Sequence, residues 1–416
     1  MGSWKRTERL EWAKWATPKR LREQPIHRWF VFPHSYTGEL VKAMIDEWGL
    51  GAKDRILDPF VGAGTTLVAA KEKGIPATGY DLSPLAVLAS RVKSTTYDVS
   101  VLRAAWNHLK RSVRPQKWNG ITNTYPELVV KALPGRLLWA FDDIDKRIRM
   151  LQQPEIVREF FRLALLACLP KFSRAVAAGG WLKWIDSAMD ESLLLPTFET
   201  HVELMMGDIE GWRGPRANRW LAAKADARRL PGKRDMFSAI ITSPPYPNRH
   251  DYTRVFGVEL MFAFMDWKET RDLRYQSICS HPESHPRGHR HKEYAPSVSL
   301  QDSLAAIRAT KPDPRVPRML EGYFRDMYVC LSKMRQISRE EARIGLVLGN
   351  AQYCGVPIHV DECVAQIGEQ VGLRCKEVRV IRRRGNSAQQ MARYGRRPSS
   401  ESIVIFTKED TVNQRT

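Results

Sequence analysis

Short apolar runs, each followed by a polar residue, are the most regular pattern in the chain. They occupy residues 56–57, 77–80, 220–225, 236–241 and 343–348. Runs of this length without alternating polar positions are typical of parallel strands that are buried on both faces. Helical patterns separate them, as in the apolar stripe at i, i+3, i+4 and i+7 from Val41 to Trp48. The alternation predicts an α/β fold with a mostly parallel sheet.

Other segments depart from this alternation. Residues 376–381 and 402–406 predict a C-terminal antiparallel hairpin, and residues 100–220 carry helical stripes broken by glycines and prolines. The expected parts are a basic N-terminal arm at 1–26, one α/β domain formed by 27–99 and 221–416, a helical insertion at 100–220, and a basic loop at 280–318 inside the domain. Residues 1–26 could also be a helix packed on the domain, because their tryptophans follow no clear period.

The charge balance narrows the class of partner. The 416 residues include 66 Lys and Arg against 46 Asp and Glu, which gives a net charge of +20. This composition favours a polyanion, because neutralised phosphates release counterions. An acidic membrane surface is the alternative, but no basic amphipathic helix stands out, so we expect nucleic acid. The tryptophans of the insertion are expected to pack rather than to stack on bases: Trp118, Trp139, Trp181, Trp184, Trp212 and Trp220.

Other compositional features indicate a cytoplasmic protein with no membrane partner, as a monomer or a dimer. No apolar run reaches the ~18 residues of a transmembrane helix, and charged residues near the start break up any signal-peptide pattern. The six cysteines lack a C-x-x-C pair and are expected to be reduced, mostly buried thiols. Four histidines, His281, His285, His289 and His291, could suggest a zinc site. Their Arg- and Pro-rich surroundings favour a solvated basic loop instead, and no metal is expected.

A glycine-rich loop at residues 59–64 connects the first apolar run to a helix. A P-loop would need Lys after the last glycine, where this chain has Thr65. A dinucleotide-binding loop would need a third glycine, where this chain has Leu67. The loop therefore suits a ligand that approaches the backbone closely and has no phosphate to neutralise.

Three carboxylates stand at the ends of predicted strands beside this loop, at Asp58, Asp81 and Asp226. Each alone could be a cap or a solvated strand end, but three beside one glycine loop indicate a shared ligand site. S-adenosylmethionine offers matching groups. Its α-amino group would suit Asp58, its ribose diol Asp81 and its adenine amine Asp226.

The segment Thr242-Ser243-Pro244-Pro245-Tyr246 follows the apolar run at 236–241. Its prolines end the strand and remove two backbone donors at the sheet edge where open α/β sheets bind ligands. A planar base could stack on Tyr246 while its exocyclic amine bonds to the Ser243 hydroxyl and to a free carbonyl group. For the segment taken alone, the alternative is a proline-stiffened turn.

These segments resemble, in order along the chain, the motifs of the DNA amino-methyltransferases, which methylate N4 of cytosine or N6 of adenine. The similar segments are 32–36 over the methionine end of the cofactor, 58–66 in the cofactor loop, 80–84 and 225–228 at the ribose and adenine, and 242–246 in the catalytic tetrapeptide with its preceding residue. The resemblance implies a Rossmann-like methyltransferase sheet, with 27–99 and 221–416 as the catalytic domain and S-adenosylmethionine as the cofactor. The implied cofactor-binding residues are Phe32, Tyr36, Asp58, Phe60, Gly62, Gly64, Thr65, Asp81 and Asp226. The implied catalytic residues are Ser243, Pro244, Pro245 and Tyr246.

The tetrapeptide begins with Ser243, where the family often has Asp. In the resemblance Ser favours cytosine N4 as the target, and adenine N6 stays open as the alternative. RNA guanine-N2 methylation and a nucleic-acid-binding module that retains the fold are further alternatives. Cytosine C5 methylation would need a cysteine nucleophile after proline, and the chain contains no Pro-Cys.

The resemblance further implies double-stranded DNA as the substrate, with the target base flipped out of the duplex. A cognate restriction endonuclease or defence system is an expected partner. The insertion at 100–220 is the candidate target-recognition subdomain, and the basic loop at 280–318 is the alternative. Phosphate contacts are expected from arginines at the C-terminal hairpin and after the tetrapeptide. These are Arg249, Arg382, Arg383, Arg384, Arg393, Arg396 and Arg397.

Overall fold

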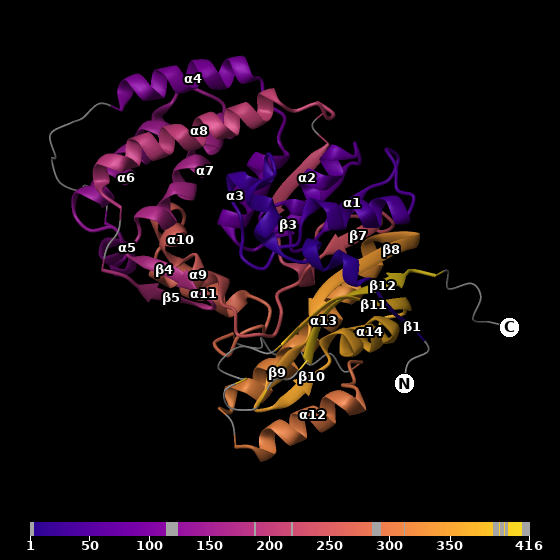
Figure 1. Ribbon diagram of the computed structural model, residues 1–416. Coiled ribbons are helices and arrows are strands. Elements are labelled where there is room, and N and C mark those ends of the chain that lie inside the picture. The colour runs from indigo at the N-terminus through magenta and orange to yellow at the C-terminus, as the bar shows by residue number, and fades with distance from the viewer. Residues whose placement is uncertain are drawn as a thin grey trace.

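Within the residues that the computed structural model describes, eight strands form one central sheet in the order β1-β11-β12-β8-β7-β2-β3-β6 (Figure 1). The described residues are 4–113, 124–186, 189–217, 219–284, 293–311, 313–385, 391, 395 and 398–409. The strands are β1 Lys5–Glu8, β2 Ile56–Asp58, β3 Ala77–Asp81, β6 Trp220–Lys224, β7 Phe237–Thr242, β8 Ser338–Gly349, β11 Arg374–Gly385 and β12 Pro398–Thr407. A separate small hairpin joins β9 (Ala351–Tyr353) to β10 (Val356–Ile358).

Strand direction follows the predicted pattern. The strands β6, β3, β2, β7 and β8 pair in parallel, and Ile56 lies opposite Ala77 on one side and Ala239 on the other. The strand β12 runs antiparallel to both β8 and β11. The prediction of a mostly parallel α/β sheet with a C-terminal antiparallel hairpin is confirmed.

Helices cover both faces of the sheet, as strands that are apolar on both sides require. The covering helices are α1 Gly38–Glu47, α2 Thr65–Glu72, α12 Val298–Ala309, α13 Arg315–Ile337 and α14 Val360–Gln370. On one face α1 and α2 bury Ile56, and on the other α12, α13 and α14 bury Leu57. Neighbouring residues of β2 therefore belong to different layers, because side chains alternate along a strand.

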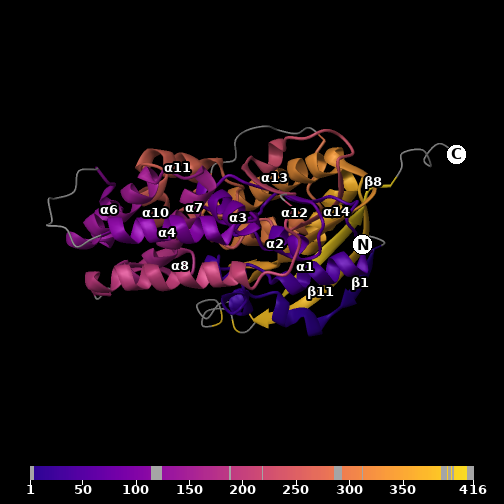
Figure 2. The same cartoon turned by 90° about the horizontal axis from the view of Figure 1, so that it is seen from above.

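The insertion is mainly helical, but it is not a separate unit. Its elements are α4 Val99–Ser112, α5 Glu127–Ala132, α6 Arg136–Met150, α7 Glu155–Phe172, β4 Ala175–Ala178, β5 Trp181–Trp184 and α8 Leu194–Glu210. Its core is continuous with four helices outside it, namely α3 Pro84–Ser94, α9 Tyr252–Val255, α10 Gly257–Ala263 and α11 Trp267–Gln276. Figure 2 shows α4, α6, α8, α10 and α11 toward one end of an elongated molecule and the strands β1 and β8 toward the other. The hairpin β4–β5 was not expected in a segment of helical texture.

The N-terminal segment differs from the arm that we expected. The strand β1 pairs in parallel with residues 377–380 of β11 and forms one edge of the sheet. Behind it Trp12 is buried, and the guanidinium group of Arg379 lies 5.2 Å from its ring. The sequence Lys-Arg-Thr-Glu carries no strand pattern, so only the pairing with β11 makes this segment a strand.

The basic segment 280–318 is also different, because it contains α12 and the start of α13. The hydroxyl of Ser297 caps α12 by accepting a hydrogen bond from the backbone N–H of Leu300 at 3.2 Å. On this helix Leu300, Leu304 and Ile307 are buried. This stripe was present in the sequence, but charged and proline residues on either side obscured it. Residues 285–292, which include His285, His289 and His291, lie outside the described residues.

All six cysteines are free thiols and five of them are buried, as predicted. Burial raises the pKa of the Cys168 thiol to about 12, so it remains protonated and unreactive near neutral pH. Among the helices that the structure describes, none is long and apolar enough to cross a lipid bilayer.

Candidate active site

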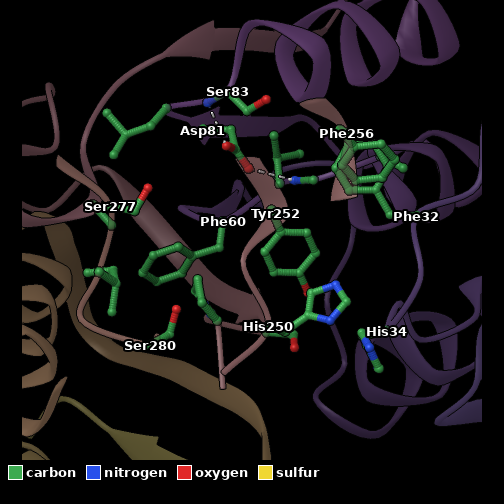
Figure 3. A pocket seen from close by; sticks show the side chains of 18 of the residues that line it. Phe32, His34, Phe60, Asp81, Ser83, His250, Tyr252, Phe256, Ser277 and Ser280 are labelled. Atoms are coloured by element: carbon green, nitrogen blue, oxygen red, sulfur yellow. Dashed lines mark hydrogen bonds between the residues drawn. The ribbon is translucent and has the colours of Figure 1, made fainter. Parts of the chain in front are cut away.

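A cavity opens at the carboxyl ends of the parallel strands (Figure 3). The strand β3 pairs with one side of β2 and β7 with the other, so the loops that leave β2 and β7 diverge. Open α/β sheets bind ligands at such a switch point. Of the predicted site residues, those that line the cavity are Phe32, Tyr36, Asp58, Phe60, Gly62, Thr65, Asp81, Asp226, Ser243 and Pro245. The predicted residues Gly64, Pro244 and Tyr246 are not among the residues that line the cavity.

Asp58 is buried at the end of β2, beside Thr242 of β7. The Thr242 hydroxyl donates a hydrogen bond to Asp58 Oδ1 at 2.5 Å, and the Tyr36 hydroxyl lies 3.4 Å from Oδ2. Burial raises the pKa of Asp58 to about 6, although the hydrogen bond from Thr242 opposes the rise. A carboxyl group in this setting would be stabilised in its ionised form by a cationic ligand such as an ammonium group.

The loop after β2 requires glycine at two positions. Gly62 and Gly64 have φ angles of +49° and +86°, which side chains other than hydrogen rarely allow. A Cβ atom at residue 64 would also lie 2.8 Å from the Cα atom of Ser90 on α3. Glycine therefore lets α2 begin at Thr65 in close contact with α3. The backbone N–H of Gly62 donates to Asp81 Oδ2 at 3.1 Å, which joins the loop to the next strand.

Asp81 ends β3 with its carboxylate in the cavity (Figure 3). Its Oδ1 atom accepts a hydrogen bond from the backbone N–H of Ser83 at 2.9 Å, and its Oδ2 atom accepts the bond from Gly62. Burial raises the pKa of Asp81 above its ordinary value. These backbone bonds hold the carboxylate in one orientation, and its remaining lone pairs can accept from hydroxyl donors such as a ribose diol.

Aromatic rings form an apolar wall of the cavity. The rings of Phe32 and Phe256 pack with centroids 4.4 Å apart. Figure 3 shows Phe60 and Tyr252 between Asp81 and the histidine side of the cavity. A wall of this kind suits a flat heteroaromatic ring. Sequence reasoning missed Tyr252 and Phe256, because their segment reads as an ordinary helix that follows the tetrapeptide.

Asp226 also lines the cavity, but its carboxylate already has a partner. Arg228 Nη2 lies 2.8 Å from Asp226 Oδ2, and the backbone N–H of Arg228 donates to Oδ1 at 2.9 Å. The same guanidinium group lies 3.2 Å from Asp326. The sequence suggested an unpaired acid at this position. In the structure Arg228 neutralises the Asp226 carboxylate and occupies some of its lone pairs.

Ser243 follows β7 directly and lines the same cavity as Asp58 and Asp81. Its hydroxyl donates a hydrogen bond to the Tyr246 hydroxyl at 3.3 Å. The Tyr246 ring packs against Gly349 of β8, where a Cβ atom would approach two ring carbons to 2.9 Å. Burial raises the pKa of Tyr246 well above its ordinary value, so the phenol is neutral near pH 7.

Three histidines that were not predicted as site residues also line the cavity. His34, which has a positive φ of 64°, meets His250 edge to face with ring centroids 4.4 Å apart. Burial together with the charges of His34 and His281 lowers the pKa of His250 to about 4, so this ring is neutral near pH 7. His281 is buried, which contradicts the solvated loop expected for it. The available signal was that His34 lies within the segment 32–36 and His250 soon after the tetrapeptide.

The predicted DNA-contacting arginines on β11 are partly occupied by ion pairs. Arg382 and Arg384 each lie 3.3 Å from Glu401 of β12, whereas Arg383 pairs with Glu8 of β1. A Cβ atom at residue 349 would lie 3.1 Å from Arg384 Nη2 as well as next to the ring of Tyr246. This places the Arg384 guanidinium group near the ring of Tyr246.

Arg249 is exposed after the tetrapeptide, with a positive φ of 69° and its guanidinium group 5.1 Å from the Tyr353 ring. The predictions for Arg393, Arg396 and Arg397 fall outside the described residues. Three potential metal ligands, His359, Asp361 and Glu362, lie close together away from the cavity, and Asp361 is buried. Arg6 lies 3.7 Å from Asp361 and 2.7 Å from Glu362, so both acids already have a cationic partner.

The cavity as a whole fits S-adenosylmethionine. It combines a buried carboxyl group at Asp58, an oriented carboxylate at Asp81, a glycine loop and an aromatic wall. Among the described residues that line it, none is Lys or Arg, so the cavity has no cation to neutralise a phosphate group. This arrangement agrees with the argument from Thr65 and Leu67 against a nucleotide.

Comparisons with known proteins give relatives over almost the whole chain. No family model matches it. The type II methyltransferase M.BsoBI of Geobacillus stearothermophilus is 26% identical and the match covers 93% of this chain and 86% of that protein. The type II methyltransferase M.AvaI of Anabaena variabilis is 25% identical, and the match covers 93% of this chain and 87% of that protein. A tRNA (guanine(10)-N2)-dimethyltransferase of Methanothermobacter thermautotrophicus is 34% identical over only 18% of this chain and 23% of its own length.

Solved structures resemble the chain only weakly. The [4+2]-cyclase SpnF is 9% identical, and the match covers 89% of this chain and 81% of the SpnF chain. Its TM-score is only 0.32. A similarity at this level supports no inference. The sequence relatives, in contrast, extend over both the sheet and the insertion. Over almost its whole length the chain is therefore similar to type II methyltransferases, and these relatives support a DNA methyltransferase with S-adenosylmethionine as its methyl donor.

Proposed function

We propose that the protein methylates the exocyclic N4 atom of cytosine within a specific sequence of duplex DNA. The observation that carries the proposal is that Ser243 and Pro245 line the same cavity as Asp58, Gly62 and Asp81. A methyl donor held by the loop after β2 would therefore lie next to a base held by the segment after β7. The target nucleotide must leave the duplex to reach this cavity.

The cofactor is proposed to lie along the strand ends. Asp58 would bind its ammonium group, Asp81 its ribose hydroxyls, and Phe32 and Phe60 the apolar faces of the ligand. Asp226 would accept from the adenine amine with the lone pairs that Arg228 leaves free. When bound, S-adenosylmethionine supplies an electrophilic methyl group on a sulfonium centre.

The residues after β7 are proposed to prepare the base. An exocyclic amine is a poor nucleophile because its lone pair is delocalised into the ring. Because the Ser243 hydroxyl donates its hydrogen to Tyr246, its lone pairs remain free to accept from the amine. The Pro244 carbonyl would accept the second amine hydrogen, while Tyr246 stacks on the ring. Both contacts favour a pyramidal nitrogen, so catalysis rests mainly on positioning and electrostatics.

Serine at the first position of the tetrapeptide favours cytosine, and adenine N6 is the nearest alternative target. RNA guanine-N2 methylation is a second candidate, because the short match to the tRNA dimethyltransferase reaches 34% identity. The type II relatives match 93% of the chain, which favours DNA. We further propose that the protein acts beside a cognate restriction endonuclease or another host-defence system.

The decisive experiment is nucleoside mass spectrometry and methylation-aware sequencing of DNA from cells that express the chain. We expect N4-methylcytosine at one sequence motif, and none from the Ser243→Ala variant expressed as a matched control. N6-methyladenine instead would show that the target base is wrong. Methyl transfer to tRNA but not to DNA would favour the RNA candidate. Calorimetry that finds no binding of S-adenosylmethionine would favour a binding module that only retains the fold.

A further inference from the structure

The hairpin β4–β5 carries two exposed tryptophans. Trp181 and Trp184 expose 55% and 49% of their surface, although sequence reasoning predicted that they pack. Tryptophan is usually largely buried, because its ring carries a large apolar surface. The two rings stand three residues apart on β5 and therefore leave opposite faces of the strand, and a half-exposed tryptophan on each face indicates that the hairpin contacts another molecule.

The hairpin is fixed against the catalytic segment. Its turn is Gly179-Gly180, and a Cβ atom at residue 180 would lie 2.8 Å from the carbonyl oxygen of Arg249 and 3.3 Å from the Cα atom of His250. His250 lines the cavity. Figure 1 shows β4 and β5 beside α9, the helix that follows His250. The two rings therefore project from an element that touches the wall of the candidate active site.

The hairpin and the end of the helix α7 that leads into it are basic. The stretch 171–184 contains Lys171, Arg174 and Lys183 and no Asp or Glu. All three cations are exposed, and within the part of the chain that the structure describes none of them takes part in an ion pair. Aromatic rings beside unpaired cations suit a DNA partner. The rings can stack on the flat apolar faces of bases, and the cations can contact the negatively charged phosphates.

We propose that the β4–β5 hairpin is a base-stacking element that stabilises DNA from which the target nucleotide has been extruded. The inference rests on the proposed function and adds the part of the chain that meets the duplex. Extrusion uncovers the faces of the neighbouring bases, and an aromatic ring placed against them lowers the free energy of the extruded state. Trp181 and Trp184 supply the rings, while Lys183 and Arg174 contact the flanking phosphates. The hairpin acts outside the cavity in which the methyl group is transferred.

The test uses the full-length protein with Trp181→Ala, Trp184→Ala and the double variant. The probe is a short duplex that contains the sequenced target site, with 2-aminopurine beside the target to report unstacking. Because one base–aromatic stack corresponds to about a 5- to 150-fold effect, the double variant should bind this duplex and methylate it at least about tenfold less well. It should also lose the fluorescence increase, while its melting temperature and its affinity for S-adenosylmethionine stay unchanged. Phenylalanine at both positions should restore most of the loss, and leucine should not.

Trp267→Ala is the matched control. Trp267 is also 55% exposed, but it begins α11 between the acidic residues Asp266 and Glu269. We expect wild-type behaviour from it. An equal loss in this variant would overturn the proposal, as would unchanged binding, turnover and fluorescence in the hairpin double variant. A change in sedimentation with unchanged DNA affinity would assign the hairpin to self-association and overturn it as well.

The two proposals fail in different ways. If the wild-type protein transfers no label to DNA, the proposed function is wrong and the stacking role is wrong with it. If the wild type labels DNA and the hairpin double variant labels it equally well, only the stacking role is wrong.

Discussion

Replacing Asp58 by asparagine should raise the stability of the ligand-free protein and weaken its binding of the cofactor. Asp58 is a buried acid whose pKa is raised from an ordinary value of 3.8 to about 6. A group with a raised folded-state pKa contributes stability below its unfolded-state pKa, and this stability is lost as the pH rises through the folded-state pKa. At about pH 7.5 the ligand-free protein therefore carries a destabilising charge. Asp58→Asn removes that charge and keeps an oxygen atom for the Thr242 hydroxyl.

The size of the effect follows from the two pKa values. Their difference corresponds to about 3 kcal/mol of additional folding free energy for the variant at about pH 7.5. With an unfolding entropy of about 2.1 cal/mol/K per residue, a chain of 416 residues converts this into a melting-temperature rise of ~3 °C. At about pH 5 most folded wild-type molecules already hold Asp58 neutral, so the gain should fall to about half.

Thermal unfolding of the ligand-free proteins at both pH values measures the stability, and calorimetry with S-adenosylmethionine measures binding. We expect a more stable variant that binds the cofactor at least about tenfold more weakly, because a charge-assisted hydrogen bond is lost. Thr242→Val is the matched control, since it removes a hydrogen bond that favours the ionised form and should lower stability at about pH 7.5. A variant with the same gain at both pH values, or with wild-type cofactor affinity, would refute the reasoning.

Three further predictions concern residues 243–246 and the fold. Ser243→Ala and Tyr246→Ala should each abolish most methyl transfer while cofactor affinity stays near the wild-type value, and a loss of binding in both would show that the cavity is misassigned. Gly349→Ala should lower turnover at least about tenfold by displacing the Tyr246 ring, which a new Cβ atom would approach to 2.9 Å; wild-type kinetics would contradict this. Asp208→Ala should lower the free energy of unfolding by about 3–5 kcal/mol, as measured by chemical denaturation. Asp208 is buried, accepts a hydrogen bond from Trp29 Nε1 and forms a bidentate ion pair with Arg28. A loss below about 1 kcal/mol would show that water replaces these contacts.

The sheet and much of the candidate site could be predicted, because strands that are buried on both faces appear in the sequence as short apolar runs. A strand such as residues 237–242 is buried throughout and therefore mostly apolar, and the polar residues at its end mark the edge where ligands bind. The prolines at 244 and 245 made the end of that strand explicit. Asp58 and Asp81 were found by the same argument and line the cavity.

Contacts between distant residues could not be predicted from local patterns. Asp226 was expected to be free, yet its ion pair extends through Arg228 to Asp326 on α13, about a hundred residues further along the chain. Trp181 was expected to pack, because nothing in its own segment shows that Gly180 directs the hairpin onto the backbone of Arg249. In each case the neighbour that decides the environment belongs to a different element.

The pairing of β1 with β11 has a consequence for biosynthesis. Thr7 and Glu377 are bonded across 370 residues, so β1 leaves the ribosome long before its partner exists. At about 5–20 residues per second this interval lasts roughly 20–70 s. During it the composition Lys-Arg-Thr-Glu keeps the unpaired strand hydrated and a poor template for aggregation. A nascent chain therefore completes this edge of its sheet only after residue 380 has been synthesised, and the mature fold cannot form before that point.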